Sequence, residues 1–427
     1  MIQASIITIG DELLIGQVVD TNSAWMAQAL NKAGIKVIRR VAVGDVWDDI
    51  WDALEEESRH ADIILITGGL GPTADDITKP LLCKYFNGKM QVNNDVLAHV
   101  SYLFEQVFKR PLTERNKKQA EVPDTCTVLP NKRGTAPGMW FEKQYTLAPS
   151  AEQVSKIFVS LPGVPHEMKG LMTDEVIPAL VRRFSLPHIA HRTLVTFGIG
   201  ESSLADLIQG FEETLPAHIK LAYLPNYGLV RLRLTTAGYH AADVEAEMDA
   251  RFATLQTLVK PYLVTNTDDT MENVVAKLLL ARGQTLSTAE SCTGGYIASL
   301  ITARPGASAY YNGSVVSYSY QAKQDMLDVS NQTLQTEGAV SEAVVLQMAK
   351  GALHHLKTDY TIAVSGIMGP DGGIADKPVG TVWVAVGNSQ QLVTKKFHFR
   401  FDRERNITLT AMNALNMLRQ FMVDQIV

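Results

Sequence analysis

A strand pattern changes into a helix pattern within Thr288-Ala289-Glu290-Ser291-Cys292-Thr293-Gly294-Gly295. The residues from Gln284 to Ala289 alternate as in a strand, and Gly295 to Ile301 repeats apolar residues at helical spacing. A helix N-terminus presents unpaired backbone N–H groups and the positive end of the helix dipole. We therefore expect this junction to belong to an α/β fold and to bind an anionic oxygen, either a phosphate or a tetrahedral oxyanion.

Two side chains at this junction are candidate nucleophiles, Ser291 and Cys292. A thiolate at a helix N-terminus has a lowered pKa, which favours Cys292. The plainer interpretations are that Ser291 or Thr293 caps the helix and that Cys292 is a small buried side chain. Gly294 and Gly295 either form the turn or bring the backbone close to a ligand. These residues alone leave the alternatives open.

A candidate partner for the nucleophile follows the next strand pattern. Asn312-Gly313 is typical of a turn, and the β-branched and aromatic residues after it predict a strand that ends before Lys323. A lysine just past a buried strand, partly removed from water, has a lowered pKa and can act as a general base. The commoner outcome for any single lysine is a side chain exposed to solvent.

The first 170 or so residues alternate strand and helix patterns. We expect strands from Ala4 to Ile9, Ile35 to Val43 and Asp62 to Thr67, and helices from Asn22 to Ala33 and Val46 to Arg59. This order predicts a three-layer αβα fold with a mostly parallel sheet. Ligands of such sheets bind beyond the carboxyl ends of the strands.

Glycines and acidic residues gather after each of these three strands. The loops contain Gly10, Asp11, Glu12, Asp20, Asn22, Gly44, Asp45, Gly68, Gly69, Gly71, Thr73, Asp75 and Asp76. Glycines let a phosphate approach backbone N–H groups, and the carboxylates can hold a hard divalent cation that bridges phosphates. A helix cap or a solvated loop position is the simpler interpretation of each carboxylate singly. Taken together, they predict a site.

Length and composition narrow the class of protein. The chain has 427 residues, which predicts two or three domains, and 46% of them are hydrophobic, as in globular proteins. A net charge of −6 argues against nonspecific binding to nucleic acid or to a membrane surface. There is no long apolar run and no signal peptide, so we expect a cytoplasmic protein. The three cysteines, Cys83, Cys126 and Cys292, indicate neither a disulfide framework nor a zinc site.

A segment of different character runs from about 171 to 265. Three strand patterns, the last two joined by a hairpin-like loop at Pro225 to Gly228, and an amphipathic helix from Ala241 to Leu258 predict a small α+β module. It has no Gly-x-x-Gly loop and no clear basic stripe, so we expect a spacer or dimerisation role and no RNA binding. A polar linker, Thr265 to Thr270, leads to a last α/β domain at 270–427.

The last domain resembles the C-terminal domain of the CinA family. The resemblance is carried by the stretch from Ala289 to Gly295, by Tyr318 with Lys323, and by Gly366-Ile367-Met368-Gly369-Pro370-Asp371-Gly372-Gly373. It implies an amidohydrolase that converts nicotinamide mononucleotide into nicotinic acid mononucleotide and ammonia, without a cofactor. Ser291 would be the nucleophile, Lys323 its base and Tyr318 a supporting residue. The candidate substrate-binding residues are Thr293, Gly294, Gly295, Gly366, Gly369, Asp371, Gly372 and Arg403.

The first domain, 1–170, resembles the N-terminal CinA domain, which is itself similar to molybdopterin-binding proteins of the MoaB and MogA type. Besides the strand-end loops, the matching stretches are Pro130 to Gly138, in which Gly134 and Gly138 would flank a loop lining the pocket, and Leu161 to Met168. The resemblance implies an ADP-ribose pyrophosphatase that yields AMP and ribose 5-phosphate. It would use a divalent cation of the Mg, Mn or Co type, held by Asp45, Asp75 and Asp76.

The resemblance also implies a KH-like fold for the middle segment and a homodimer. Two functions follow from the sequence. The first is a bifunctional hydrolase of pyridine-nucleotide recycling, acting on nicotinamide mononucleotide and ADP-ribose. The second is a non-catalytic protein that binds a pterin or a nucleotide and acts in competence or in the response to DNA damage.

Overall fold

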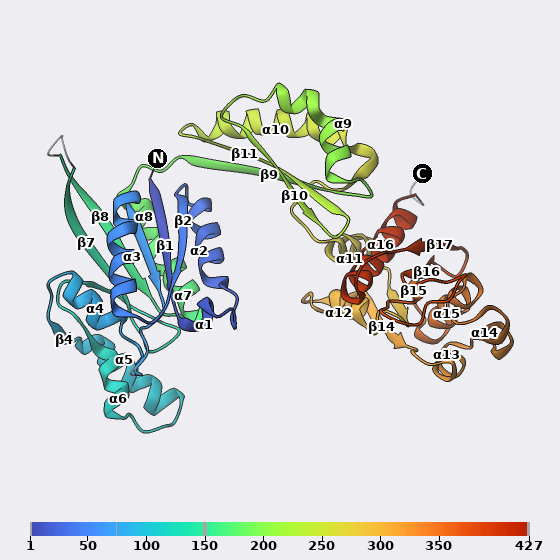
Figure 1. The fold of residues 1–427 in the computed structure, drawn as a ribbon, viewed down its shortest axis with the longest axis horizontal. Helices are drawn as coiled ribbons and strands as arrows, with labels where there is room; N and C mark the ends of the chain where they lie inside the picture. The colour runs from blue at the N-terminus through green and yellow to red at the C-terminus, as the bar shows by residue number, and fades with distance from the viewer. Residues whose placement is uncertain (1, 74, 148–151, 425–427) are drawn as a thin grey trace. The chain divides into compact units, whose positions relative to one another are not determined.

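The computed structural model describes residues 2–73, 75–147 and 152–424, and their contacts divide the chain into two compact units (Figure 1). The first unit consists of residues 1–190 and 236–245, and the second of residues 191–235 and 246–427. The first contains a six-stranded sheet, and the second contains a five-stranded sheet and most of a four-stranded one. None of the described helices is both long enough and apolar enough to span a bilayer.

The first unit contains a six-stranded sheet. Its strands are β1 (Gln3–Ile9), β2 (Lys36–Val43), β3 (Ile63–Thr67), β6 (Thr127–Leu129), β7 (Gly138–Leu147) and β8 (Glu152–Leu161), in the order β2-β1-β3-β8-β7-β6. Strands β2, β1, β3 and β8 are parallel. Strand β7 is antiparallel to both of its neighbours, so β6 points the same way as the parallel set. The carboxyl ends of β1, β2, β3, β8 and β6 therefore share one edge.

Helices cover both faces of this sheet, as the alternating pattern predicts. Residues of α2 (Thr21–Lys32), α7 (Pro165–Leu171) and α8 (Ile177–Arg183) pack in the core on one face, and residues of α3 (Trp47–His60) and α4 (Thr78–Tyr85) pack in the core on the other. The unit also contains α1 (Asp11–Leu14), α5 (Asn94–Tyr102) and α6 (Glu114–Lys117). Ile6 packs in one core with Met26 of α2, whereas the adjacent Ile7 packs in another with Ile50 of α3. Successive strand residues point to opposite faces, so the three-layer prediction is confirmed. The sequence analysis placed no elements between 78 and 129, where α4, α5 and α6 lie.

The second unit contains a five-stranded sheet with the order β14-β13-β15-β16-β17. Its strands are β13 (Leu286–Glu290), β14 (Tyr311–Val316), β15 (Tyr360–Gly366), β16 (Thr381–Gly387) and β17 (Leu392–His398). Its helices are α11 (Met271–Arg282), α12 (Tyr296–Thr302), α13 (Tyr320–Leu327), α14 (Asn331–Glu337), α15 (Glu342–Leu356) and α16 (Arg403–Asp424). The predicted turn at Asn312-Gly313 is wrong: both residues lie inside β14, where Gly313 pairs with Ser287.

Residues of the middle segment form a separate four-stranded sheet in the order β10-β11-β9-β12. The elements are β9 (His188–Phe197), α9 (Glu201–Glu213), β10 (Lys220–Asn226), β11 (Leu229–Gly238), α10 (Ala241–Leu258) and β12 (Leu263–Thr265). The predicted hairpin loop narrows to Tyr227 and Gly228, both with positive φ, as in the tight turns that match strand twist. Val195 and Leu229 share a core with Met271 of α11, so this sheet packs with the last domain. The boundaries of three separate domains stay a prediction.

Candidate functional site

The side chains of Ser291 and Lys323 meet in the second unit. Lys323 Nζ donates a hydrogen bond to Ser291 Oγ at 2.9 Å and another to the carbonyl oxygen of Ser317 at 2.6 Å. The two side chains are buried, with Lys323 1% and Ser291 8% exposed. Burial lowers the pKa of Lys323 from the ordinary lysine value to about 8. A neutral amine can therefore form near neutral pH, and its lone pair can accept the serine proton.

The local fold explains this meeting. Ser291 follows β13 directly, and β13 pairs in parallel with β14, so both strands deliver the chain to the same edge of the sheet. After β14 the chain enters α13, which Ser319 caps by accepting a hydrogen bond from the N–H of Ala322 at 3.0 Å. Lys323 lies in the first turn of this helix, not directly past the strand as predicted. The helical turn directs its side chain inward.

Glu290 organises the turn that carries the nucleophile. Its side chain is fully buried, and its carboxylate accepts hydrogen bonds from the backbone N–H groups of Gly295 at 3.1 Å, Ile297 at 3.0 Å and Ala298 at 2.8 Å. The Thr293 hydroxyl donates to it as well, at 2.7 Å. The carboxylate thus satisfies the free donors at the start of α12 and lies at the positive end of its dipole.

These contacts correct the predicted oxyanion site. The N–H of Gly294 donates to the carbonyl oxygen of Ser291 at 3.2 Å, and the N–H of Gly295 is taken by Glu290. Within the described part of the chain, the N–H groups of Cys292 and Thr293 have no acceptor. They are the remaining backbone donors beside the nucleophile for an oxyanion.

A cavity of about 260 Å³ opens at Ser291 and Lys323. The residues that line it are Ser291, Cys292, Tyr318, Lys323, Ala339, Val340, Ser365, Gly366, Ile367, Met368, Gly369, Asp371, Gly372 and Arg403. It therefore brings the two catalytic candidates together with the predicted glycine loop and Arg403. Thr293, Gly294 and Gly295 are not among the lining residues, and their contacts are with the turn itself.

Arg403 joins the glycine loop to Tyr318. One guanidinium nitrogen donates to the carbonyl oxygen of Gly369 at 2.9 Å, and another donates to the Tyr318 hydroxyl at 3.1 Å. The Tyr318 side chain is 64% exposed. Arg403 is the first residue of α16 and is exposed, so it lies at the mouth of the cavity with charge available for an anionic ligand.

The two nucleophile candidates differ in their electrostatic surroundings. Cys292 lines the cavity but is only 5% exposed, and burial raises the pKa of its thiol to about 12. The lowered pKa expected at a helix N-terminus is wrong because desolvation penalises the thiolate. Ser291 has a base in contact and Cys292 is protonated at neutral pH, so the geometry favours the serine.

The strand-end residues of the first unit surround a smaller cavity of about 140 Å³, whose lining includes Thr8, Glu12, Asp20, Asn22 and Thr67. Asn22 Nδ2 donates to the carbonyl oxygen of Gly163 at 2.7 Å, while Asn22 Oδ1 is buried and has no partner among the described residues. Asp20 accepts the N–H of Ser23 at 2.9 Å, so it caps α2. The unpaired acceptor on Asn22 is the group that a ligand would satisfy.

Besides Asp20, five carboxylates were predicted at this edge, and four of them, Asp11, Glu12, Asp45 and Asp75, interact electrostatically. Asp11 and Asp45 exchange hydrogen bonds, each accepting the other's backbone N–H at 3.1 Å. The pKa of Asp45 is raised, chiefly by burial and then by the charges of Asp11, Glu12 and Asp75. The fifth, Asp76, instead shapes its own loop by accepting the N–H groups of Gly71 and Thr73, both at 2.8 Å. Among described residues, no group of three or more His, Cys, Asp or Glu is placed to hold a metal.

Close packing explains two of the predicted glycines at this edge. A Cβ on Gly69, whose φ is +63°, would lie 2.1 Å from Thr78 Oγ1. A Cβ on Gly134 would lie 2.0 Å from Glu167 Cδ. Of the remaining predicted glycines, Gly10 precedes α1, Gly68 follows β3, and Gly138 begins β7. All five positions adjoin the ends of strands in the first sheet.

Sequence reasoning quoted Glu290 without giving it a role. The available signal was an acidic residue between a strand and a helix start, where carboxylates stabilise free N–H groups. It also missed Asn131, whose Nδ2 donates to the carbonyl oxygen of Ala136 at 2.8 Å and to Glu167 Oε2 at 2.6 Å. Burial raises the pKa of Glu167, against the effect of that hydrogen bond. Asn131 and Glu167 both fall in stretches that carry the resemblance.

Comparisons with known proteins divide the chain into three consecutive matches. The family described as a probable molybdopterin binding domain matches residues 5–182, the damage-inducible protein CinA KH domain matches residues 191–264, and the CinA C-terminal domain matches residues 268–422. The similarity thus extends over nearly all of the chain.

Curated relatives match over almost their full length. A CinA-like protein of Cytophaga hutchinsonii is 45% identical, covering 98% of this chain and 98% of its own. A CinA-like protein of Flavobacterium psychrophilum is 44% identical, covering 97% of each chain. The crystal structure of competence damage-inducible protein A from Klebsiella pneumoniae is 39% identical and covers 36% of this chain and 98% of that one, with a TM-score of 0.35.

Proposed function

The chain belongs to the CinA family, and on that basis we propose that its second unit hydrolyses the carboxamide of nicotinamide mononucleotide. The observation that carries this proposal is the buried contact of 2.9 Å between Lys323 Nζ and Ser291 Oγ at the floor of a cavity. Amide hydrolysis at neutral pH needs an activated nucleophile and donors for the oxyanion, and both lie at this point.

The first half of the reaction forms an acyl-enzyme. Neutral Lys323 takes the proton of Ser291 as Oγ bonds to the carboxamide carbon, and the carbonyl oxygen becomes an oxyanion. The N–H of Cys292, the next residue along the cavity lining, is the backbone donor that would support this oxyanion. As the carbonyl re-forms, the carbon–nitrogen bond breaks, and Lys323 gives its proton to the departing nitrogen, which leaves as ammonia.

The second half returns the enzyme to its starting state. Neutral Lys323 takes a proton from a water molecule whose oxygen attacks the ester carbon. Collapse of this second tetrahedral intermediate breaks the bond to Ser291 Oγ, which recovers its proton from Lys323. The product is nicotinic acid mononucleotide. The base restored in each half-reaction is the same amine.

Residues at the mouth of the cavity would bind the phosphate and the ribose of the mononucleotide. The substrate carries one 5′-phosphate, and Arg403 is the cation among the lining residues that reaches solvent. Arginine binds phosphate through parallel N–H donors. We assign Arg403 to the phosphate, with the Gly366–Gly373 loop supporting the ribose.

For the first unit we propose cleavage of ADP-ribose to AMP and ribose 5-phosphate. Support comes from the match to the molybdopterin-binding family at residues 5–182 and from the glycine-rich loops at the carboxyl edge of the sheet. The unpaired Asn22 Oδ1 indicates that this edge receives a polar ligand. Pyrophosphate oxygens would approach the backbone beside Gly69.

A divalent cation suits the chemistry of the carboxylates at this edge. Burial, and then the negative charges of its neighbours, raise the pKa of Asp45, so a cation there would stabilise its ionised form. Mg²⁺ is commonly bound by one or two carboxylates together with substrate phosphates. Since no three of the described acidic side chains converge here, Asp45 and at most one neighbouring carboxylate would hold it together with the substrate phosphates. When bound, it would neutralise charge on the pyrophosphate.

A homodimer and a cytoplasmic location remain predictions.

Two assays on the purified chain test these proposals. Ammonia release from nicotinamide mononucleotide should require Ser291 and Lys323, and AMP release from ADP-ribose should require a divalent cation. If neither product forms with or without metal, the protein is a binding protein for nucleotides or pterins. Product in one assay alone would confine catalysis to one unit.

A further inference from the structure

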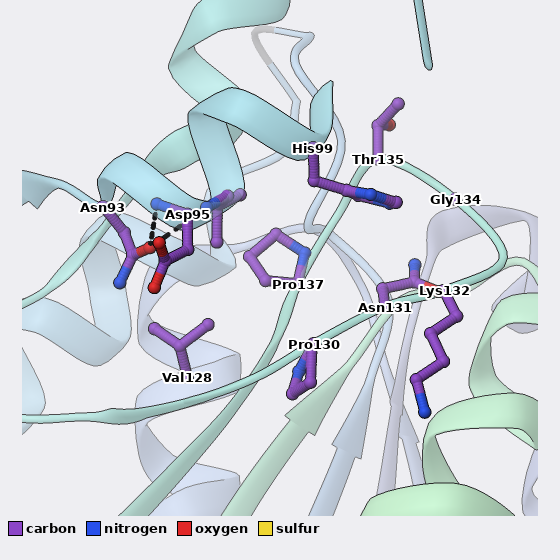
Figure 2. A pocket seen from close by; sticks show the side chains of 11 residues that line it. Asn93, Asp95, His99, Val128, Pro130, Asn131, Lys132, Gly134, Thr135 and Pro137 are labelled. Atoms are coloured by element: carbon purple, nitrogen blue, oxygen red, sulfur yellow. Dashed lines mark hydrogen bonds between the residues drawn. The ribbon is translucent and has the colours of Figure 1, made fainter. Parts of the chain in front are cut away.

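A second cavity, of about 450 Å³, lies at the ligand-binding edge of the first sheet (Figure 2). It is lined by residues of α5 and of the loop that follows β6, from Pro130 to Pro137. Because β6 points the same way as β1, β3 and β8, this loop emerges at the same edge as the strand-end loops. None of its lining residues belongs to the smaller cavity at Asn22. The edge therefore offers two separate recesses.

His99 lines this cavity and carries a ring nitrogen that has no partner in the described part of the chain. Its Nε2 atom is buried and has no hydrogen-bond partner among the described residues. Figure 2 shows the imidazole projecting from α5 past Pro137 toward Thr135. A buried ring nitrogen without a partner is unfavourable unless a ligand satisfies it. Either tautomer suits a ligand edge that carries both donors and acceptors.

The wall opposite α5 is preformed. Asn131 holds the loop closed, since its Nδ2 donates to Ala136 and Glu167 and its Oδ1 accepts the N–H of Arg133 at 3.0 Å. Arg133 is fixed in turn by Asp174 at 2.8 Å. A loop held by this network keeps its shape when no ligand is bound in the cavity. Ligand binding therefore costs little entropy for ordering the loop.

Part of the lining is apolar. Val96, Val128, Pro130 and Pro137 line the cavity alongside His99. A recess with apolar walls and a few polar groups, and of this volume, is typical of sites for a heteroaromatic ring with its attached sugar. Lys132 also lines it, with a side chain 69% exposed that runs away from His99 in Figure 2. Its ammonium lies 4.0 Å from a Glu175 carboxylate oxygen, and the high exposure of the side chain leaves it able to turn to a phosphate instead.

We propose that this cavity binds the purine nucleoside half of ADP-ribose, with His99 at the edge of the base and Lys132 near the first phosphate. The proposal rests on the pyrophosphatase function above and assigns its substrate orientation. The ends of β8 and β6 are separated by β7, so roughly 10 Å of sheet edge lies between the two recesses. A molecule with two sugars joined by a pyrophosphate spans such a gap, with its second ribose at Asn22.

Calorimetric binding of AMP to the full chain tests the assignment. We expect His99→Leu to weaken AMP binding at least about tenfold, while His99→Gln, which keeps a donor and an acceptor, recovers most of it. Binding of ribose 5-phosphate should stay unchanged in both variants. Tyr102→Ala, on the same helix and outside the cavity lining, is the matched control and should bind AMP normally. Thermal unfolding of each variant checks that the fold is intact.

Several outcomes would overturn the proposal. AMP binding that His99→Leu leaves intact, or no AMP binding by the wild type, removes the purine from this cavity. A reduced pterin bound more tightly than AMP, with loss in His99→Leu, would make it a pterin site. ADP-ribose turnover separates this proposal from the pyrophosphatase function. If His99→Leu cleaves ADP-ribose with an unchanged KM, the cavity assignment is wrong and the pyrophosphatase function stands. If AMP binding depends on His99 but ADP-ribose is not cleaved, the pyrophosphatase function is wrong and the cavity assignment stands.

Discussion

Lys323 Nζ lies 2.9 Å from Ser291 Oγ, although the two residues belong to different segments of the second unit. The amine also donates to the Ser317 carbonyl oxygen, which fixes its position. Both side chains are buried, which strengthens the hydrogen bond between them. A serine next to a lysine with a lowered pKa is the arrangement that a hydrolase without an imidazole needs.

Replacing the nucleophile should abolish one activity and leave the other. We expect Ser291→Ala to lower kcat for ammonia release at least about 10³-fold, since nothing else in contact with Lys323 can attack the amide. The neighbouring Cys292→Ala is the matched control and should retain activity within about threefold, because its thiol is protonated. Full activity in Ser291→Ala together with loss of activity in Cys292→Ala would show that Cys292, not Ser291, is the nucleophile.

The rate of deamidation should rise with pH. The pKa of Lys323 is lowered to about 8 by burial, and the neutral form is the base, so about a tenth of the enzyme is active at pH 7 and about nine-tenths at pH 9. The logarithm of kcat should climb with a slope near one and level off above about pH 8. Stopped assays between pH 6 and 10 measure this curve. A flat profile across that range would exclude Lys323 as the base.

The lowered pKa of Lys323 also determines how the stability of the fold changes with pH. The folded state binds fewer protons than the unfolded state between pH 8 and the ordinary lysine pKa, so this group makes the fold more stable as pH rises through that window. Lys323→Met removes the charge and should flatten that part of the dependence. Denaturant unfolding at several pH values compares the two proteins. Equal pH dependence in both would mean that the amine is not desolvated.

Glu290→Gln should lower both the free energy of unfolding and the kcat for ammonia release. The amide nitrogen of glutamine would face a backbone N–H whichever way it is placed, because one carboxylate oxygen accepts from Ile297 and the other from Ala298. We expect a loss of about 2 kcal/mol or more in the free energy of unfolding and a kcat at least about tenfold lower. Glu404→Gln, at an exposed position in the first turn of α16, is the control. Normal kcat in Glu290→Gln would show that the turn keeps its shape without the carboxylate.

Arg403→Met should act on substrate binding. Loss of the guanidinium removes the phosphate partner and the contacts to Gly369 and Tyr318, so KM should rise about 10-fold to 100-fold while kcat changes little. Arg405→Met is a suitable comparison, since its guanidinium packs on the Phe401 ring at 3.9 Å and does not line the cavity. A kcat that falls as much as kcat/KM would instead place Arg403 in the chemical step.

Removal of divalent cations by a chelator should inhibit the activity of the first unit and leave that of the second unit unchanged. EDTA should lower AMP release from ADP-ribose at least about 100-fold, and added Mg²⁺ should restore it, because the acidic edge relies on a cation to approach the pyrophosphate. Ammonia release from nicotinamide mononucleotide should be unchanged in the same samples. Asp45→Asn should weaken the Mg²⁺ dependence. AMP release that persists in EDTA would remove the metal from the mechanism.

Local pattern was enough to predict the layers. The apolar runs from Ala4 to Ile9 and from Asp62 to Thr67 correspond to β1 and β3, and the glycine-rich loops follow them at one edge. Apolar periodicity is a property of neighbouring residues, so it can be read without the fold. The same holds for Ser291, which the strand–helix junction indicated.

Contacts between distant segments had to come from the tertiary structure. Pairing with β13 draws Asn312-Gly313 into a strand despite its turn propensity, and packing buries Lys323 and so sets its pKa. Likewise, α5 brings His99 against a loop more than thirty residues away. The sequence by itself determined the elements and which residue types lie at their ends, because these depend on local spacing. Only the fold decided which of those side chains lose water and meet, because desolvation and hydrogen bonding depend on neighbours far along the chain.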